Sequence, residues 1–219
     1  KIKMNSPQVT VIVPTYNHEL YIGRCIRSLL KQSLPREDYE IIIVNDGSTD
    51  NTKYIIDTFK EDVRYYENQK NLGLASSLNS GIRKARGQFI IRVDSDDYVH
   101  WDYLKILSMH LQMNHELDAV SCDYILVDNK QNEIRRLNSL DYPIGCGIMF
   151  RLKDLIEIGL YDEKFRINEE KDLRIRFLKK YDISRVALPL YRYLMHDNNI
   201  TSDVNEVKYY DKILKDKHK

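Results

Sequence analysis

Hydrophobic positions in the first hundred residues form short apolar runs separated by stretches of helical spacing. Three β-branched or aromatic runs predict buried strands, at Val9–Val13, Ile41–Val44 and Phe89–Val93, and a shorter strand is expected at 63–66. Apolar residues recur every three or four positions over 20–30, 54–59 and 74–85. This alternation of strands and helices predicts an α/β protein with a Rossmann-like, mostly parallel central sheet flanked by helices.

Each of the three longer strands is followed by polar residues of the kind that form turns. These loops are Pro14-Thr15-Tyr16-Asn17, Asp46-Gly47-Ser48 and Asp94-Ser95-Asp96-Asp97. Pro14 is expected to stop the first strand, and Asn17 to cap the next helix. Ligands of open α/β sheets bind at the carboxyl ends of the strands. The loops therefore predict one crevice that holds an aromatic ring, hydroxyl groups and several carboxylates.

The second half of the chain departs from regular alternation. Helices are predicted at 101–113, 152–158 and 169–180, and strands at 119–127, 148–150 and 186–194, with a hairpin turn at 128–132. In the helix at 169–180, Leu173, Ile175, Phe177 and Leu178 are expected to be buried. We find no shift in composition and no internal repeat. One domain over residues 1–219 is therefore predicted, with a small antiparallel extension of the sheet in this half.

Charge and cysteine content exclude few classes of protein. The chain has 34 Lys and Arg against 33 Asp and Glu, so its overall charge gives no reason to expect nucleic-acid binding. Cys25, Cys122 and Cys146 lack metal-site spacing, and reduced thiols in a cytoplasmic protein are expected. No apolar run predicts a membrane span. The tail from Val207 to Lys219 has five lysines and two aspartates, so it is either a solvated end or a basic segment that rests on a membrane surface.

The carboxylates at 94–97 are the strongest candidate for chemistry. They are Asp94, Asp96 and Asp97. Carboxylates at this spacing repel one another unless a cation or a hydrogen-bonding ligand compensates them. A calcium loop would require Gly and Glu where the chain has Val99 and Lys105. A phosphatase nucleophile would require a smaller residue than Tyr98. A solvated helix-capping loop and a Mg²⁺ or Mn²⁺ site remain.

Three further candidates have plain alternatives when each is taken alone. Glu169 and Glu170 begin a predicted helix, where acidic residues interact favourably with the helix dipole. Either one could instead act as a general base in a cleft. His196 could be a packed histidine or a ligand, and Tyr16 could pack in the fold or stack on a base.

Taken together and in order, the motifs resemble the family 2 glycosyltransferases, over roughly residues 8–202. The matching motifs are Val11-Ile-Val-Pro-Thr-Tyr-Asn17, Ile43-Val-Asn-Asp-Gly-Ser-Thr-Asp50, Asn71-Leu-Gly73, Asn79-Ser-Gly81, Asp94-Ser-Asp-Asp97, Ile158-Gly-Leu-Tyr-Asp-Glu163, Glu169-Glu-Lys-Asp-Leu173 with Arg176, and Pro189-Leu-Tyr191 through His196. The resemblance implies a GT-A fold. It also implies a nucleotide-binding half at 1–100, an acceptor-binding half at 101–205 and a basic tail at 206–219.

The resemblance also implies roles for individual residues. Pro14, Thr15, Tyr16, Asn17 and Asp46 would bind the nucleotide of the donor. Asp94 would reach the ribose, Asp96 and His196 would bind the metal ion, and Asp97 would orient the metal waters or the donor sugar. Glu170 falls where the family places its catalytic base. That position is more often Asp, so Glu170 is preferred and Glu169 stays open. Leu194 replaces an arginine that is common two residues before the histidine.

The implied activity is a metal-dependent, inverting transfer of a sugar from a nucleotide-diphosphate sugar to an acceptor hydroxyl. The donor would be a UDP-sugar, the cofactor Mn²⁺ or Mg²⁺, and the acceptor a polysaccharide, a lipid-linked glycan or a protein. A cytoplasmic enzyme is expected, with a peripheral membrane contact through its tail. The alternatives are a sugar-phosphate nucleotidyltransferase, whose glycine-rich loop is absent from the sequence after the first strand, and a non-catalytic domain that binds nucleotide sugars.

Overall fold

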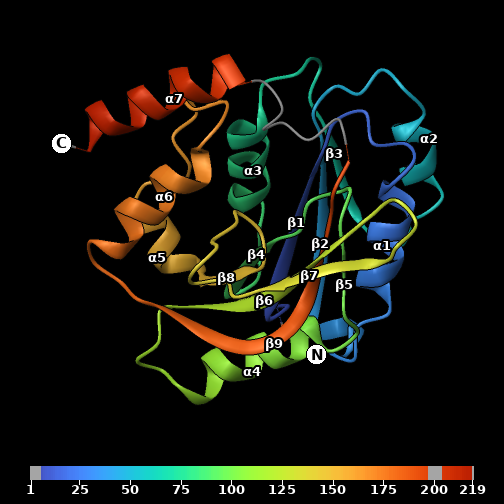
Figure 1. The fold of residues 1–219 in the computed structure, drawn as a ribbon. Helices are drawn as coiled ribbons and strands as arrows, with labels where there is room; N and C mark the ends of the chain where they lie inside the picture. The colour runs from blue at the N-terminus through green and yellow to red at the C-terminus, as the bar shows by residue number, and fades with distance from the viewer. Residues whose placement is uncertain (1–5, 197–203, 219) are drawn as a thin grey trace.

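The computed structural model describes residues 6–196 and 204–218, with side chains in the last helix from residue 208 onward. Within these residues a nine-stranded sheet crosses the molecule in the order β3-β2-β1-β4-β8-β6-β9-β5, and β7 pairs with β6 (Figure 1). None of the described helices is both long enough and apolar enough to cross a membrane.

The first half of the sheet is parallel, as predicted. Its strands are β1 (Val9–Thr15), β2 (Tyr39–Asn45), β3 (Arg64–Glu67) and β4 (Phe89–Arg92). β1 lies between β2 and β4 and runs parallel to both, so the carboxyl ends of these three strands meet at one edge. This arrangement confirms the expectation that the polar loops after them lie together.

The second half adds mostly antiparallel pairs. Its strands are β5 (Tyr98–Val99), β6 (Ala119–Val127), β7 (Glu133–Leu137), β8 (Ile148–Arg151) and β9 (Ile183–Leu194). β8 is antiparallel to both β4 and β6, whereas β6 and β9 are parallel. The register of the β6–β9 pair shifts near Pro189, which opposes Asp123. This irregularity is where a residue without an N–H can be accommodated in a strand.

Helices cover both faces of the sheet. They are α1 (Ile22–Leu30), α2 (Thr52–Asp57), α3 (Leu74–Arg83), α4 (Tyr103–Met113), α5 (Leu152–Glu157), α6 (Glu169–Leu178) and α7 (Val204–Lys217), with a 3₁₀ turn at Arg36–Asp38. In Figure 1, α1 and α2 lie on one side of β1 and β2, and α3 lies on the other. α5, α6 and α7 are grouped beyond α3.

Alternation along the strands divides the core in two. Val9, Val11 and Val13 of β1 pack with α1 and α4 residues, whereas Ile12 packs with α3, α5 and α6 residues. Side chains of successive strand residues point to opposite faces of the sheet, so a strand buried on both faces requires an unbroken apolar run. This explains why the sequence signal of β1, β2 and β4 is continuous instead of alternating.

Several local predictions are wrong. β1 continues through Pro14, because Pro14 pairs only with Val44 of β2 and the pairing with β4 ends at Ile12 and Arg92. Asn17 does not cap α1, which begins at Ile22. Leu178 is exposed because it lies at the last position of α6, beyond the buried face of that helix. The strand β5 and the helical structure of the tail were not predicted.

Candidate functional site

Hydrogen bonds tie the three loops at the sheet edge to one another. The Asp46 N–H donates to the carbonyl oxygen of Thr15 at 2.8 Å, which joins the ends of β1 and β2. The Asn17 N–H donates to Ser48 Oγ at 2.9 Å, and Asn17 Oδ1 accepts from the Thr49 N–H at 2.8 Å. The Asn17 side chain therefore joins two loops, with its own backbone at a φ of 54°.

His18 connects this pair of loops to the acidic one. Its Nδ1 lies 2.6 Å from Ser95 Oγ, and its N–H donates to Thr52 Oγ1 at 2.9 Å. The predicted nucleotide loops and the 94–97 loop are therefore joined at one edge of the sheet, as expected from the parallel topology. Sequence reasoning missed His18, whose position after a turn gave no signal of this contact.

Asp46 forms hydrogen bonds with the loop of residues 68–73. Its carboxylate accepts hydrogen bonds from Asn68 Nδ2 at 2.8 Å, the Leu72 N–H at 2.9 Å and the Gly73 N–H at 2.8 Å. Asp46 is buried. In the structure this residue shapes the loop of residues 68–73, and a contact with the donor stays a prediction.

Arg92 is the centre of a buried charge cluster that joins β4 to α6. Its Nε and Nη2 donate to the two oxygens of Asp94 at 2.6 and 3.0 Å, and its Nη1 donates to Glu169 Oε1 at 3.0 Å. Burial alone would lower the pKa of Arg92, but the two carboxylates raise it and keep the guanidinium charged. One side chain thus links a predicted donor residue to the helix that carries the predicted base.

The two glutamates at the start of α6 have different surroundings. Glu169 is buried, and burial raises its pKa to about 7 although Arg92 acts in the opposite direction. Glu170 is partly exposed, and its carboxylate accepts no hydrogen bond from any residue that the structure describes. Glu169 receives one Arg92 hydrogen bond against two for Asp94, which is consistent with its raised pKa. Of the two carboxylates, that of Glu170 is the one with freedom to reach an acceptor.

The backbone at Gly145 lies directly beside this pair of elements. A Cβ at Gly145 would be 2.8 Å from Arg92 Nη1 and 2.9 Å from Glu170 Cβ. Only glycine fits at this distance without moving its neighbours. The loop before β8, whose residues could not be assigned from the sequence, therefore forms a wall of the site next to the predicted base.

Asp96 of the acidic loop and His196, which follows β9, lie together with largely buried side chains. Asp96 Oδ2 is 2.8 Å from His196 Nε2. The His196 ring stacks on Tyr21, with centroids 5.1 Å apart and an interplanar angle of 16°. Arg24 donates from Nη2 to the Asp96 carbonyl oxygen at 2.8 Å, and its guanidinium lies over the Tyr98 ring. The predicted metal ligands are thus adjacent, with Asp96 on a loop that α1 contacts through Arg24 and His196 just after β9.

Asp97 attaches the acidic loop of residues 94–97 to β9 through hydrogen bonds. Its side chain is 1% exposed, and its oxygens accept from the Leu194 N–H at 2.8 Å and from the Tyr191 hydroxyl at 2.7 Å. Tyr191 in turn accepts a hydrogen bond from the Asp94 N–H at 3.1 Å. Burial and the nearby Asp96 and Asp94 carboxylates raise the pKa of Asp97. In the structure Asp97 thus holds the acidic loop against β9, and a contact with metal waters or the donor sugar stays a prediction.

The donor set at Asp96 and His196 fits a divalent metal ion. A carboxylate oxygen and an imidazole nitrogen are ligands that Mn²⁺ accepts. A second cluster is formed by single ligand atoms of Asp94, Asp97 and Cys146, which lie within 4.8 Å of one another. Burial raises the pKa of Cys146. The carboxylates of this cluster already have partners, because Asp94 accepts from Arg92 and Asp97 accepts from Leu194 and Tyr191.

The remaining predicted nucleotide residues lie at the carboxyl end of β1. Tyr16 is 41% exposed, whereas Pro14 and Thr15 are buried in the strand. The Thr15 hydroxyl is buried and has no hydrogen-bond partner among the described residues. Of the residues that sequence reasoning missed, Arg92 had a signal: a charged residue within an apolar strand must find a buried partner.

Comparisons with known proteins show the family of this chain. The sequence model of "Glycosyl transferase family 2" matches residues 10–182. The chain belongs to this family. A relative called uncharacterized glycosyltransferase EpsJ, of Bacillus subtilis, is 43% identical over 132 residues, which are 59% of this chain and 36% of EpsJ. Putative glycosyltransferase EpsH of the same organism is 42% identical over 55% of this chain and 35% of its own length. The matched regions thus span about a third of these relatives.

Solved structures support the same fold. The crystal structure of Staphylococcus aureus TarS 1-349 in complex with UDP-GlcNAc has a TM-score of 0.78 at 24% identity, over 90% of this chain and 61% of that one. Mannosyltransferase PcManGT of Pyrobaculum calidifontis, in complex with GDP-Man and Mn²⁺, has a TM-score of 0.72 at 20% identity, over 89% and 59%. The predicted GT-A fold, with its mixed sheet and flanking helices, is confirmed.

Proposed function

We propose that this chain transfers a sugar from a nucleotide-diphosphate sugar, with UDP as the favoured nucleotide, to a hydroxyl of a glycan or polysaccharide. The observation that carries the proposal is the Arg92 cluster. It holds Asp94 of the acidic loop and Glu169 of α6 within one hydrogen-bonded unit. This unit keeps the edge proposed to bind the donor next to the helix that carries the proposed base, which supports sugar transfer.

Each step is assigned to residues of this chain. Tyr16, Thr15 and the loop that Asp46 shapes would bind the nucleotide. Asp96 and His196 would hold Mn²⁺ or Mg²⁺, which neutralises the charge that develops on the departing diphosphate. Glu170 would accept the proton of the acceptor hydroxyl as its oxygen attacks the anomeric carbon. One carboxylate is sufficient for a direct displacement, so the proposed stereochemical outcome is inversion.

Relatives and structural neighbours support the choice of substrate class. TarS is named a poly(ribitol-phosphate) beta-N-acetylglucosaminyltransferase and has been crystallised with UDP and with UDP-GlcNAc. PcManGT has been crystallised with GDP-Man and Mn²⁺. These proteins make a nucleotide sugar and a divalent cation the first ligands to test. The nucleotidyltransferase alternative finds no support, because β1 ends with Pro14 and Thr15 and is followed by Tyr16 and Asn17 and not by a glycine-rich loop.

A peripheral membrane contact through the tail has no support in these observations. Tyr210 and Leu214, two of the apolar residues that such a contact would use, are buried against the domain. Binding to anionic vesicles that does not change when the exposed α7 lysines are replaced would dispose of this part of the prediction.

The central test is a donor screen with and without metal. We expect one nucleotide sugar, with Mn²⁺, to raise the midpoint of thermal unfolding by roughly 5–10 °C at saturating concentration. The same mixture should release the nucleoside diphosphate when an acceptor is added. Asp96→Ala should abolish both effects, because the metal loses a carboxylate ligand. Asp57→Ala, an exposed carboxylate in α2, is the matched control and should behave as wild type.

Two results would contradict the proposal. Full transfer by Asp96→Ala, or by wild type in excess EDTA, would remove the metal from the mechanism. Binding of the nucleotide sugar without any release of nucleoside diphosphate, across a broad panel of acceptors, would favour a non-catalytic binding domain.

A further inference from the structure

The tail helix α7 packs on α6, the helix that begins with Glu169 and Glu170. Tyr210 and Leu214 of α7 are buried together with Phe165 and Ile167, the two apolar residues just before α6. Figure 1 shows α7 beyond α6, on the outer side of the molecule. The basic tail is therefore part of the folded domain, and it contacts the segment that leads into the predicted base.

One set of polar contacts attaches α7 to the residue before α6. Asn168 precedes the helix with a φ of 68°, is 3% exposed and makes no capping hydrogen bond to α6 with its side chain. Instead, its Nδ2 donates to Asp211 Oδ1 at 2.9 Å. The Lys171 ammonium lies 3.6 Å from the same Asp211 oxygen. A residue type that usually caps its own helix is thus used here to bind a second helix.

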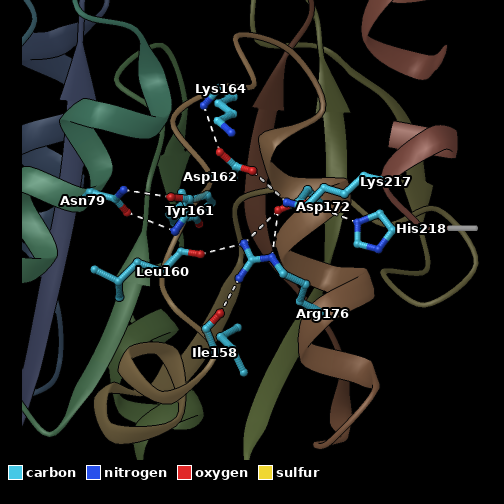
Figure 2. Close-up of polar contacts among 10 residues, drawn as sticks. All are labelled: Asn79, Ile158, Leu160, Tyr161, Asp162, Lys164, Asp172, Arg176, Lys217 and His218. Carbon is cyan, nitrogen blue, oxygen red and sulfur yellow. Dashed lines mark hydrogen bonds and ion pairs between the residues drawn. The ribbon is translucent and has the colours of Figure 1, made fainter. Parts of the chain in front are cut away.

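A second set attaches the end of α7 just after the predicted base. The Asp172 side chain is 0% exposed and accepts from Lys217 Nζ at 2.6 Å, His218 Nε2 at 2.8 Å and Arg176 at 2.8 Å (Figure 2). Burial would raise the pKa of Asp172, but these hydrogen bonds lower it. Lys217 also lies 2.8 Å from Asp162 Oδ2. Two of the three side chains that bind this buried carboxylate, Lys217 and His218, therefore come from the end of the tail.

The two attachments enclose Glu169 and Glu170 in the sequence, with Asn168 before them and Asp172 after them. A ten-residue helix has little stability of its own, and like charges in its first turn repel one another. External contacts are therefore needed to keep this turn in a single geometry. The contacts from α7 supply them on both sides of the predicted base.

We propose that α7 is a positioning element for sugar transfer, in which Asp211, Lys217 and His218 fix the first turn of α6 and thereby the direction of the Glu170 carboxylate. This proposal rests on the proposed function, in which Glu170 is the base. None of the three residues touches substrate; they act through α6. Their effect is therefore expected on the chemical step and not on donor binding.

The test compares Asp211→Asn and Lys217→Met with Lys215→Met, an exposed lysine of the same helix. A displacement of about 1 Å at a reacting group can cost roughly 100-fold in rate, so we expect kcat to fall about tenfold in the first two variants. The donor KM and the affinity for nucleotide with Mn²⁺ should stay within about twofold. Lys217→Arg should restore most of kcat, because it retains the positive charge next to Asp172.

Hydrogen exchange gives a readout that is independent of turnover. Amides of residues 168–173 should exchange faster in Asp211→Asn and Lys217→Met than in wild type and Lys215→Met. Unchanged exchange, or faster exchange with an unchanged kcat, would overturn the role of α7. A loss of kcat together with loss of nucleotide binding would overturn it too, because that pattern signals general unfolding. A wild-type chain that turns over no donor would instead refute the proposed function, whatever the exchange data show.

Discussion

The two ends of the candidate site are built differently. At the donor end, three loops follow three parallel strands, and hydrogen bonds such as Asn17 to Ser48 and His18 to Ser95 join one loop directly to the next. At the base end, the first turn of α6 is held by Arg92 from β4, by the loop at Gly145 and by α7. The donor end follows from topology, whereas the base end depends on long-range contacts between charged side chains.

This difference has a functional meaning under the proposed mechanism. A nucleotide can be bound by loops that adjust locally, because its contacts are spread over many groups. A base must place one carboxylate within hydrogen-bond reach of one hydroxyl. The base end therefore requires more contacts that fix its geometry. Some substitutions should lower kcat without changing donor binding, and others should weaken donor binding without changing kcat.

The largest difference between the effects on catalysis and on donor binding is expected from Glu170→Gln. Removing the base should lower kcat roughly 10²–10⁴-fold, because the amide cannot accept the proton. The affinity for nucleotide with Mn²⁺ should stay at the wild-type value, measured by calorimetry. Glu116→Gln, at an exposed glutamate, serves as the control. Turnover near the wild-type rate would move the base assignment to another residue, with Glu169 the first to test.

A pair of glycine substitutions should sharpen the comparison with a smaller effect. A Cβ at Gly145 would press on Arg92 and Glu170, so Gly145→Ala should lower kcat about tenfold. A Cβ at Gly47, whose φ is 74°, would be 2.8 Å from the backbone of Lys70, so Gly47→Ala should raise the donor KM by a similar factor.

Gly159→Ala is the control for this pair. Gly159 has a φ of 87°, and a Cβ added there would meet no other atom within 4 Å, so the substitution should cost only stability, about 1 kcal/mol. Steady-state kinetics measures all three variants. If Gly145→Ala and Gly47→Ala changed the same kinetic parameter, the two ends would not be separable.

The smallest effect is expected in the pH dependence of stability. Burial raises the pKa of Glu169 from 4.5 to about 7, so the folded state binds a proton more readily than the unfolded chain between these values. The free energy of unfolding contributed by this group should therefore fall as pH rises from 4.5 to 7. Glu169→Gln should remove roughly 1–3 kcal/mol of this decline, measured by urea denaturation across the window. An unchanged slope would contradict the raised pKa.

The regular elements were largely predictable from residue patterns. The strand at 119–127 and the hairpin turn after it agree with β6 and β7, and α6 begins at Glu169 as expected. The errors involve single residues whose partners lie far away in the chain. Asn17 is a residue type that often caps helices. Its side-chain oxygen instead accepts a hydrogen bond from the Thr49 N–H, in the loop after β2.

The tail is a larger example of a segment whose partners could not be predicted from the sequence. Its lysines and apolar residues indicated an amphipathic segment, but not the surface that it would cover. Tyr210 and Leu214 find that surface at Phe165 and Ile167, and Lys217 finds the buried Asp172. Hydrophobic spacing reveals that a face will be buried, and it carries no information about which other face is complementary.

The sequence by itself determined most of the strands and helices, the edge at which the polar loops meet and the family to which the chain belongs. The elements follow from local periodicity, the edge from the parallel connections between strands, and the family from the order of the motifs. Only the tertiary structure decided the partners of the buried charges: Arg92 bonds to Asp94 and Glu169, and Asp172 bonds to Lys217 and His218. A buried charge must be paired, but the identity of its partner is set by the packing of distant elements.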